Sequence, residues 1–113
     1  MADPYLYSDS KTSWGVGEII NKGSEPVDVI IKVLGPVTAP WTISINSVVM
    51  TINKDLLEDD IIIIDTGKPD VTINGDDAMT ELDGDLPMLL PGSNSINCST
   101  TTISLEWRDK WLL

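Results

Sequence analysis

The stretch Asp-Asp-Ile-Ile-Ile-Ile-Asp-Thr-Gly-Lys-Pro-Asp-Val-Thr-Ile-Asn-Gly, residues 59–75, decides the fold of this chain. Its four consecutive isoleucines predict a strand, because β-branched side chains fit a pleated sheet and lose freedom in a helix. We expect this strand to be buried on both faces, so that an aspartate in place of Ile63 would unfold the domain. Turn residues then lead into a second strand, Val71–Ile73, and Asn74-Gly75 turn the chain again. The stretch is therefore a hairpin at the centre of an all-β domain.

Alternation of apolar and polar residues predicts further strands on both sides of this hairpin. Alternate apolar residues share one face in each of three regions: Val27, Val29, Ile31 and Val33; then Trp41, Ile43, Ile45 with Val48, Met50 and Ile52 beyond a turn at Asn46-Ser47; then Ile103, Leu105, Trp107 and Trp111. Residues 76–85 hold five carboxylates and leave room for one helical turn at most. Since no segment keeps a 3.6-residue apolar period, we expect an all-β, two-sheet antiparallel sandwich of the jelly-roll kind.

The length of 113 residues predicts one domain with its own core. We assign residues 13–113 to the sandwich, beginning with an edge strand over 13–21 that bends at Gly15 or Gly17. Residues 1–12 are polar except for Tyr5, Leu6 and Tyr7. They form an N-terminal arm, a linker from a longer protein, or a remnant of expression.

The charge of the chain excludes several partners. Eighteen acidic residues against seven basic ones give a formal charge of −11, which opposes binding to the phosphates of nucleic acid. The charge favours solubility and protects sheet edges, and the alternative is an acidic face that docks a basic partner or a cation. No apolar run approaches the roughly 20 residues of a membrane helix, and Met1-Ala2-Asp3-Pro4 lacks signal-peptide character. We expect a soluble protein that is made in a cytoplasm and binds neither nucleic acid nor membrane.

Metal and triad chemistry are not expected. The chain has no histidine, which removes most serine and cysteine triads, and its single cysteine makes a zinc site improbable. We interpret Cys98 as a buried structural thiol. Asp76, Asp77, Asp83 and Asp85 are oxygen ligands close in sequence, but they lack the spacing of a calcium-binding EF-hand loop. The prediction is no catalytic residue, no cofactor and no metal site.

Asp65-Thr66-Gly67 matches the catalytic tripeptide of aspartic proteases, in which two such aspartates share a proton and activate water. Those enzymes continue with a small residue, whereas Lys68 and Pro69 follow here. The favoured interpretation is a hairpin turn in which Asp65 accepts backbone hydrogen bonds and Gly67 takes positive φ. We expect positive φ also at Gly23, in the turn 21–26. A dimeric aspartic protease that uses Asp65 stays a remote alternative.

Tryptophans are candidates for packing or for recognition. Trp41, Trp107 and Trp111 fall on apolar faces, which favours core or interface packing over sugar stacking. Trp14 is the least determined of the four tryptophans, and it is the one side chain that we single out as a ligand or partner contact.

Five pieces of the chain occur in an order and spacing that resemble a known family. They are Asn21, Gly23, Pro26 and Gly35; Asp60–Asp65; Val71–Gly75; Leu90–Ile96; and Leu105–Leu112. From about Trp14 to Leu113 the chain is similar to the C-terminal domain of the siphophage distal tail protein (Dit) family, a virion structural protein of phages and prophages.

The resemblance implies a galectin-like β-sandwich that serves as a structural module at the tail tip. In that family the N-terminal domain builds a sixfold ring, and the C-terminal domain projects outward to contact receptor-binding or other baseplate proteins. The expected partners are therefore other tail proteins, the expected location is the virion tail after synthesis in the bacterial cytoplasm, and self-association is expected only through the ring-forming domain that these residues do not include. Galectins bind galactosides through a histidine, which this sequence lacks.

The alternative function is a carbohydrate-binding module for host-surface glycans, in which Trp14 stacks on a sugar and carboxylates or amides hold its hydroxyls. A Trp14→Ala variant on a glycan array separates this function from a purely structural one.

Overall fold

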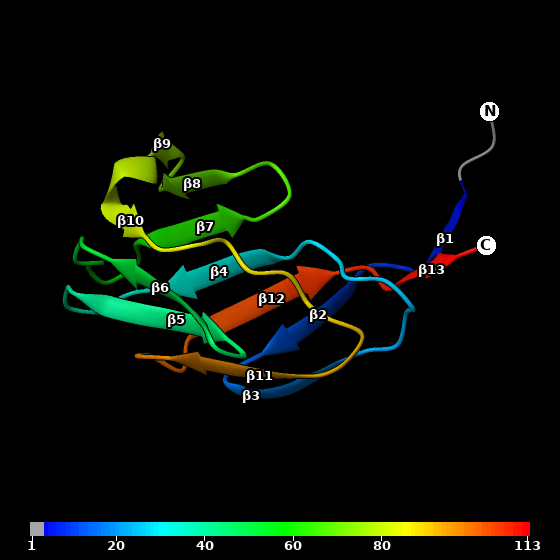
Figure 1. Ribbon diagram of the computed structural model, residues 1–113. Coiled ribbons are helices and arrows are strands. Elements are labelled where there is room, and N and C mark those ends of the chain that lie inside the picture. Colours follow the sequence, from blue (N-terminus) through cyan, green and yellow to red (C-terminus); the bar gives the residue numbers. More distant parts are fainter. Residues whose placement is uncertain (1–3) are drawn as a thin grey trace.

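The computed structural model describes residues 4–113, which form two antiparallel sheets and a small ribbon (Figure 1). The six-stranded sheet has the spatial order β2 (Lys11–Trp14), β12 (Ile103–Trp107), β4 (Ile30–Leu34), β7 (Ile61–Asp65), β8 (Asp70–Ile73) and β9 (Asp76–Asp77). The five-stranded sheet has the order β10 (Leu82–Asp83), β6 (Val48–Ile52), β5 (Trp41–Ile45), β11 (Gly92–Cys98) and β3 (Gly17–Asn21). The ribbon pairs β1 (Tyr5–Tyr7) with β13 (Lys110–Leu112), and one 3₁₀ turn, η1 (Met79–Glu81), is the single helical turn that the acidic segment was expected to allow.

The core lies between the two large sheets and confirms the predicted all-β, two-sheet antiparallel sandwich. Strands of both sheets contribute alternate residues to it, as a half-buried strand requires. The buried apolar residues are Ile19, Val27, Val29, Ile31, Val33, Trp41, Ile43, Ile45, Met50, Ile52, Leu56, Ile62, Ile64, Val71, Ile73, Ala78, Leu89, Ile96, Ile103, Leu105 and Trp107. Val48 was expected inward, but it lies at the start of β6 and is exposed.

The isoleucine strand β7 does not have two buried faces, so that prediction is wrong. Ile62 and Ile64 are fully buried, whereas Ile61 is 38% exposed and Ile63 is half-buried. The reason is that β7 lies between β4 and β8 in a sheet whose core is on one side. Successive side chains alternate between the faces, so a run of four isoleucines has to place two of them outside. The expectation that an aspartate at Ile63 would unfold the domain depended on the same error.

The turns follow the predicted chemistry, but two glycines lack the positive φ that was expected of them. Asp65 accepts hydrogen bonds from the backbone N–H of Gly67 (3.0 Å) and of Lys68 (3.2 Å), which confirms the turn. Gly67 has no positive φ; a Cβ there would lie 2.8 Å from the Asp28 carboxylate. Gly23 also lacks positive φ, and a Cβ there would lie 2.2 Å from the carbonyl oxygen of Lys110. Gly23 needs glycine because the backbone of Lys110 packs against it, whereas Gly67 is only crowded by the Asp28 side chain.

The N-terminal region divides between the sheets. The predicted bend separates β2 from β3 through positive φ at Gly15 and Gly17, so the chain crosses from the edge of one sheet to the edge of the other. Residues 4–12 contain β1 and the beginning of β2. The division of the chain at residue 12 into an arm and a sandwich stays a prediction, and residues 1–3 of that arm lie outside the described residues.

The two faces of β7 give a direct test of this architecture. Ile62→Ala should lower the free energy of unfolding by about 2–5 kcal/mol, because it leaves a cavity between the sheets. Ile61→Ala is the matched control on the same strand, and it should cost no more than about 1 kcal/mol because Ile61 is part of the surface. Urea denaturation of the two variants measures the difference, and equal losses would contradict the one-sided burial of β7.

Candidate protein-interaction surfaces

The outer face of the six-stranded sheet carries an apolar surface. Directly opposite residues of an antiparallel sheet share a face. Trp14, Ser104, Lys32 and Ile63 are opposite one another across β2, β12, β4 and β7, and Leu34 is opposite Ile61 in the neighbouring row. We define Trp14, Lys32, Leu34, Ile61 and Ile63 as the outer sheet face.

Large apolar side chains on this face contact water. Trp14 is 76% exposed, Leu34 is 40% exposed and Ile61 is 38% exposed. The outer side of an antiparallel sandwich sheet is ordinarily polar, so large apolar residues there are candidates for a contact with another molecule. Leu34, Ile61 and Ile63 are neighbours on β4 and β7, whereas Ser104 and Lys32 separate Trp14 from Ile63.

Trp41, Trp107 and Trp111 were expected on apolar faces. Trp41 and Trp107 are in the core, as expected. Trp111 is only half-buried, because β12 ends at Trp107 and the chain leaves the sheet before Trp111 on β13.

Acidic residues border the outer sheet face on one side. Asp65 and Asp70 are directly opposite each other on β7 and β8, and Asp77 is opposite Thr72 at the edge. Like charges at directly opposite positions destabilise a sheet. The outer sheet face therefore has an apolar centre with one cation, Lys32, and an acidic border.

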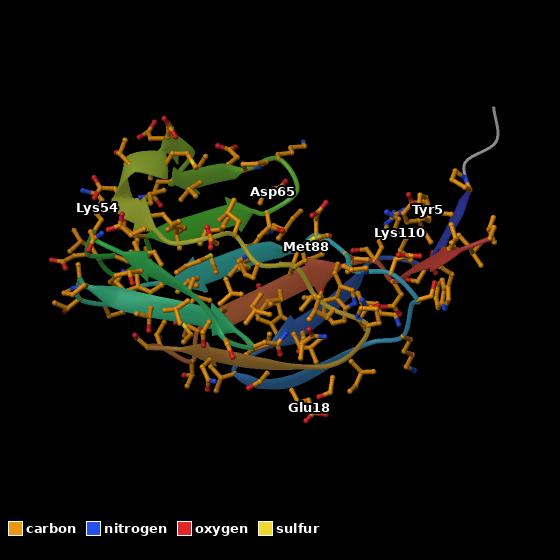
Figure 2. All side chains as sticks on the ribbon, viewed as in Figure 1. Tyr5, Glu18, Lys54, Asp65, Met88 and Lys110 are labelled. Atoms are coloured by element: carbon orange, nitrogen blue, oxygen red, sulfur yellow. The ribbon has the colours of Figure 1, made fainter. Side chains whose placement is uncertain are left out.

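A groove of about 540 Å³ adjoins this face where the ribbon leaves the sandwich. Its floor is formed by residues 26–30 and by the indole of Trp107, and its walls are the 65–68 turn, Met88 and the ribbon residues Tyr7 and Lys110. Figure 2 shows Asp65, Met88 and Lys110 along this side of the molecule, with Lys54 at the opposite end. Five segments that are distant in sequence meet in this groove, which is why sequence patterns gave no sign of it.

A buried carboxylate holds the base of the ribbon beside the groove. Asp109 is 0% exposed, forms an ion pair with Lys11 and accepts a hydrogen bond of 2.9 Å from Nε1 of Trp107. Its backbone N–H donates to Oγ of Ser8 at 2.9 Å. Burial raises the pKa of Asp109, but the hydrogen bonds from Lys11 and Trp107 outweigh burial, so the pKa lies below its ordinary value. This network fixes both the ribbon and the indole that forms the groove floor.

The opposite end of the molecule is acidic. A cavity of about 410 Å³ is lined there by Lys54, Asp60, Asn74, the β9 aspartates and Glu81. A 2.8 Å hydrogen bond from Asn74 lowers the pKa of Asp60 below its ordinary value. The calcium candidates divide between two sheets, with Asp76 and Asp77 on β9 and Asp83 on β10. Among residues 4–113, no three acidic or sulfur ligands come together as a metal site.

Two side chains with possible reactivity, Asp65 and Cys98, have surroundings that limit their chemistry. The Asp65 carboxylate, the candidate of the protease alternative, is occupied in closing its own turn. Cys98 is half-buried, and burial raises the pKa of its thiol, which lowers the fraction of reactive thiolate. In the part of the chain that the structure describes, no helix has the length and apolar character needed to cross a membrane.

Comparisons with known proteins agree with the fold. The family model of the siphovirus-type tail component, C-terminal domain, matches residues 22–111. The chain is similar to the crystal structure of the Dit (gp 19.1) protein of phage SPP1, described as a paradigm of the hub adsorption apparatus in phages that infect Gram-positive bacteria, with a TM-score of 0.82 and 14% identity. The match covers 97% of this chain and 50% of that one, so this chain spans about half the length of the SPP1 protein. No curated protein sequence matches.

The buried Asp109 makes stability depend on pH. Asp109→Asn should lower the free energy of unfolding by about 1–3 kcal/mol at pH 7, because it removes a charged partner from Lys11 and Trp107. Since the folded pKa is depressed, this contribution is present above the unfolded pKa of about 4 and is lost as pH falls through the folded value. Denaturation of both proteins across the acidic range measures it. Asp76→Asn, an exposed control, should change little, and a wild-type advantage that did not decrease with falling pH would contradict the mechanism.

Proposed function

The chain belongs to the family of siphovirus-type tail components, C-terminal domain, and from this premise we propose that it is a structural domain of a phage tail tip or baseplate hub that binds other tail proteins, including receptor-binding proteins. The observation that supports a binding role is the outer sheet face, where Leu34 and Ile61 expose apolar surface over the central strands and Trp14 exposes it at the edge. A sandwich that functioned alone would gain solubility from polar residues at these positions. The protein therefore acts by contact rather than by catalysis, within the assembled tail.

Trp14 is the proposed anchor of this contact. It is on the edge strand β2, where an indole reaches a partner without displacing a neighbouring strand. Large, rigid aromatic side chains dominate the energetics of protein interfaces, and surrounding apolar residues exclude water from them. Leu34, Ile61 and Ile63 add a second apolar region on the same sheet face, two to three strands from Trp14. The stem of Lys32 between them adds apolar surface while its ammonium group stays hydrated.

A ring assembly is not a property that we propose for these residues alone. The SPP1 protein has another half that this chain does not match. The proposed role is that of a domain that projects outward from the tail. Its position in the tail is set by the protein or domain to which it is attached.

The binding role predicts a division between two sheet faces. Trp14→Ala and Ile61→Ser should each weaken binding to a tail protein encoded beside this one by roughly tenfold or more, as expected at the centre of an interface. Val49→Ser, which removes a comparably exposed apolar side chain from β6 in the other sheet, is the matched control and should leave binding unchanged. Titration calorimetry with purified tail proteins gives the dissociation constants, and thermal unfolding shows that each variant is folded.

Two results would remove this proposal. The first is equal binding by wild type, Trp14→Ala and Ile61→Ser to every tail protein that binds at all. The second is binding to a glycan on an array that is lost in Trp14→Ala while no tail protein binds, because this outcome assigns the exposed indole to sugar stacking.

A further inference from the structure

The edge of the five-stranded sheet at β3 is a candidate interaction surface that lies apart from the outer sheet face. β3 pairs with β11 on one side, and no strand within residues 4–113 pairs with its other side (Figure 1). An edge strand presents unpaired N–H and C=O groups, and another extended chain can add to it through the same ladder of hydrogen bonds. The direction of the β3 backbone decides which groups are available for such a ladder.

Hydrogen bonds of the neighbouring strand fix the direction of its backbone. The N–H of Ser95 on β11 donates to Oδ1 of Asn46 (3.0 Å), and the C=O of Ser95 accepts from the N–H of Asn46 (2.7 Å). Asn46 follows β5, so the backbone groups of Ser95 are directed toward β5 and away from β3. Because this direction alternates along a strand, Asn94 and Ile96 are directed toward β3.

The alternation leaves two residues of β3 at the free edge. Ile19 and Gly17 are opposite the two β11 residues that are directed toward β3, so they form the ladder with β11. Glu18 and Ile20 alternate with them and therefore direct their N–H and C=O groups outward. Within residues 4–113 no other hydrogen bond is found for these backbone groups of Glu18 and Ile20. Two donors and two acceptors are thus available in the geometry of a strand.

This edge is less protected than the other strand edges in the described part of the chain. β3 has five residues, whereas β2, β9, β10 and the two ribbon strands have two to four. Prolines and charges ordinarily blunt an edge, but β3 has no proline and one charged residue, Glu18, which Figure 2 shows at the margin of the molecule. Ile20 is 45% exposed, and a Cβ on Gly17 would have no atom within 4 Å. The edge therefore has free space and an exposed apolar side chain beside its unpaired backbone groups.

We propose that β3 binds an extended segment of another tail protein, which adds to the five-stranded sheet as a sixth strand. The proposal rests on the proposed function in that it takes the partner from the tail, but it uses the other sheet. The backbone groups of Glu18 and Ile20 form the new ladder. Side chains directly opposite in a sheet interact, so the segment should place an apolar residue opposite Ile20 and, two positions away, a lysine or arginine opposite Glu18.

A second copy of this chain fits the same edge less well. Two β3 strands that paired with each other would bring together two sandwiches that each carry a charge of −11, and the repulsion between them opposes the contact. A segment of a different protein has no such restriction. We therefore expect an added strand from another protein and not a symmetric dimer.

An array of overlapping peptides that covers the other tail proteins of the same virion tests the proposal. The peptides that bind should have the alternation of apolar and basic residues described above. In the complex with the strongest peptide, the amide protons of Glu18 and Ile20 should exchange with solvent more slowly by roughly tenfold or more, because they gain hydrogen bonds. Hydrogen exchange followed by NMR resolves the two amides, and Ile19, which is already bonded to β11, is the internal reference.

Variants at the free edge separate the main chain from the side chains. Ile20→Pro removes an outward N–H without breaking the ladder to β11, so it should stay folded and weaken the peptide roughly tenfold or more. Ile20→Ala keeps the N–H and should weaken the peptide less. If Ile20→Pro does not fold, Glu18→Pro makes the same test at the other outward N–H.

Thr12→Pro on β2 is the matched control. The N–H of Gly15 donates to the C=O of Ile103 on β12, so by alternation Thr12 directs its N–H away from the sheet. Thr12→Pro therefore removes an outward N–H from an edge of the other sheet and should leave peptide binding unchanged. Thermal unfolding shows that each variant is folded.

The outcomes separate this inference from the proposed role of the outer sheet face. Peptide binding that persists in Trp14→Ala but is lost in Ile20→Pro supports the added strand, whatever the fate of the contact through Trp14. The inference is overturned if no peptide binds, if the Glu18 and Ile20 amides exchange equally fast in the complex, if folded Ile20→Pro binds as wild type does, or if Thr12→Pro or Trp14→Ala causes an equal loss. Self-association of the chain that Ile20→Pro abolishes also overturns it, because a second copy then occupies the edge.

Discussion

Burial of Ile62 and Ile64 between the two sheets is the interaction on which the rest of the structure depends. The four isoleucines alone leave the register of β7 open, because a shift by one residue would bury Ile61 and Ile63, which are side chains of the same kind. The Asp65 turn, closed by hydrogen bonds from the backbone N–H groups of Gly67 and Lys68, holds the register in which Ile62 and Ile64 are buried. The same register determines what the outside of the sheet displays. Once the core takes two of four consecutive isoleucines, the others have to face outward beside Leu34 and Lys32. The exposed apolar surface is thus the geometric complement of the core.

Most of the fold could be predicted from the sequence because most of it is recorded in local patterns. The alternation of Val27 to Val33 gives a strand with one buried side, and the Asp65 turn follows from the hydrogen-bonding reach of an aspartate. The number of covered faces is not local. Four isoleucines in a row are compatible with burial on either one or both faces, and only the arrangement of the sheets decides. The positive φ predicted for Gly23 and Gly67 was wrong for the same reason, since the residues that lie against these glycines are distant in sequence.

Among the candidate surface residues, too, some could be predicted from local sequence and others depend on long-range packing. Trp14 could be singled out because the other three tryptophans fall on apolar faces of predicted strands, and Trp14 is 76% exposed in the folded chain. Ile61 and Leu34 could not, because their exposure depends on cross-strand register. Arg108 and Lys68 are forty residues apart, and only the folded chain places both along one groove. Asp109 gave no signal either, since a carboxylate in the sequence is expected at the surface until its cationic partner is known.

Charge and surface together limit the kind of partner that the domain can bind. Two copies of the chain that met through their outer sheet faces would bring two acidic borders, including Asp65 and Asp70, to within a Debye length of about 10 Å, and both copies carry a charge of −11. Repulsion therefore opposes self-association through this face and favours a different protein with cations around an apolar centre.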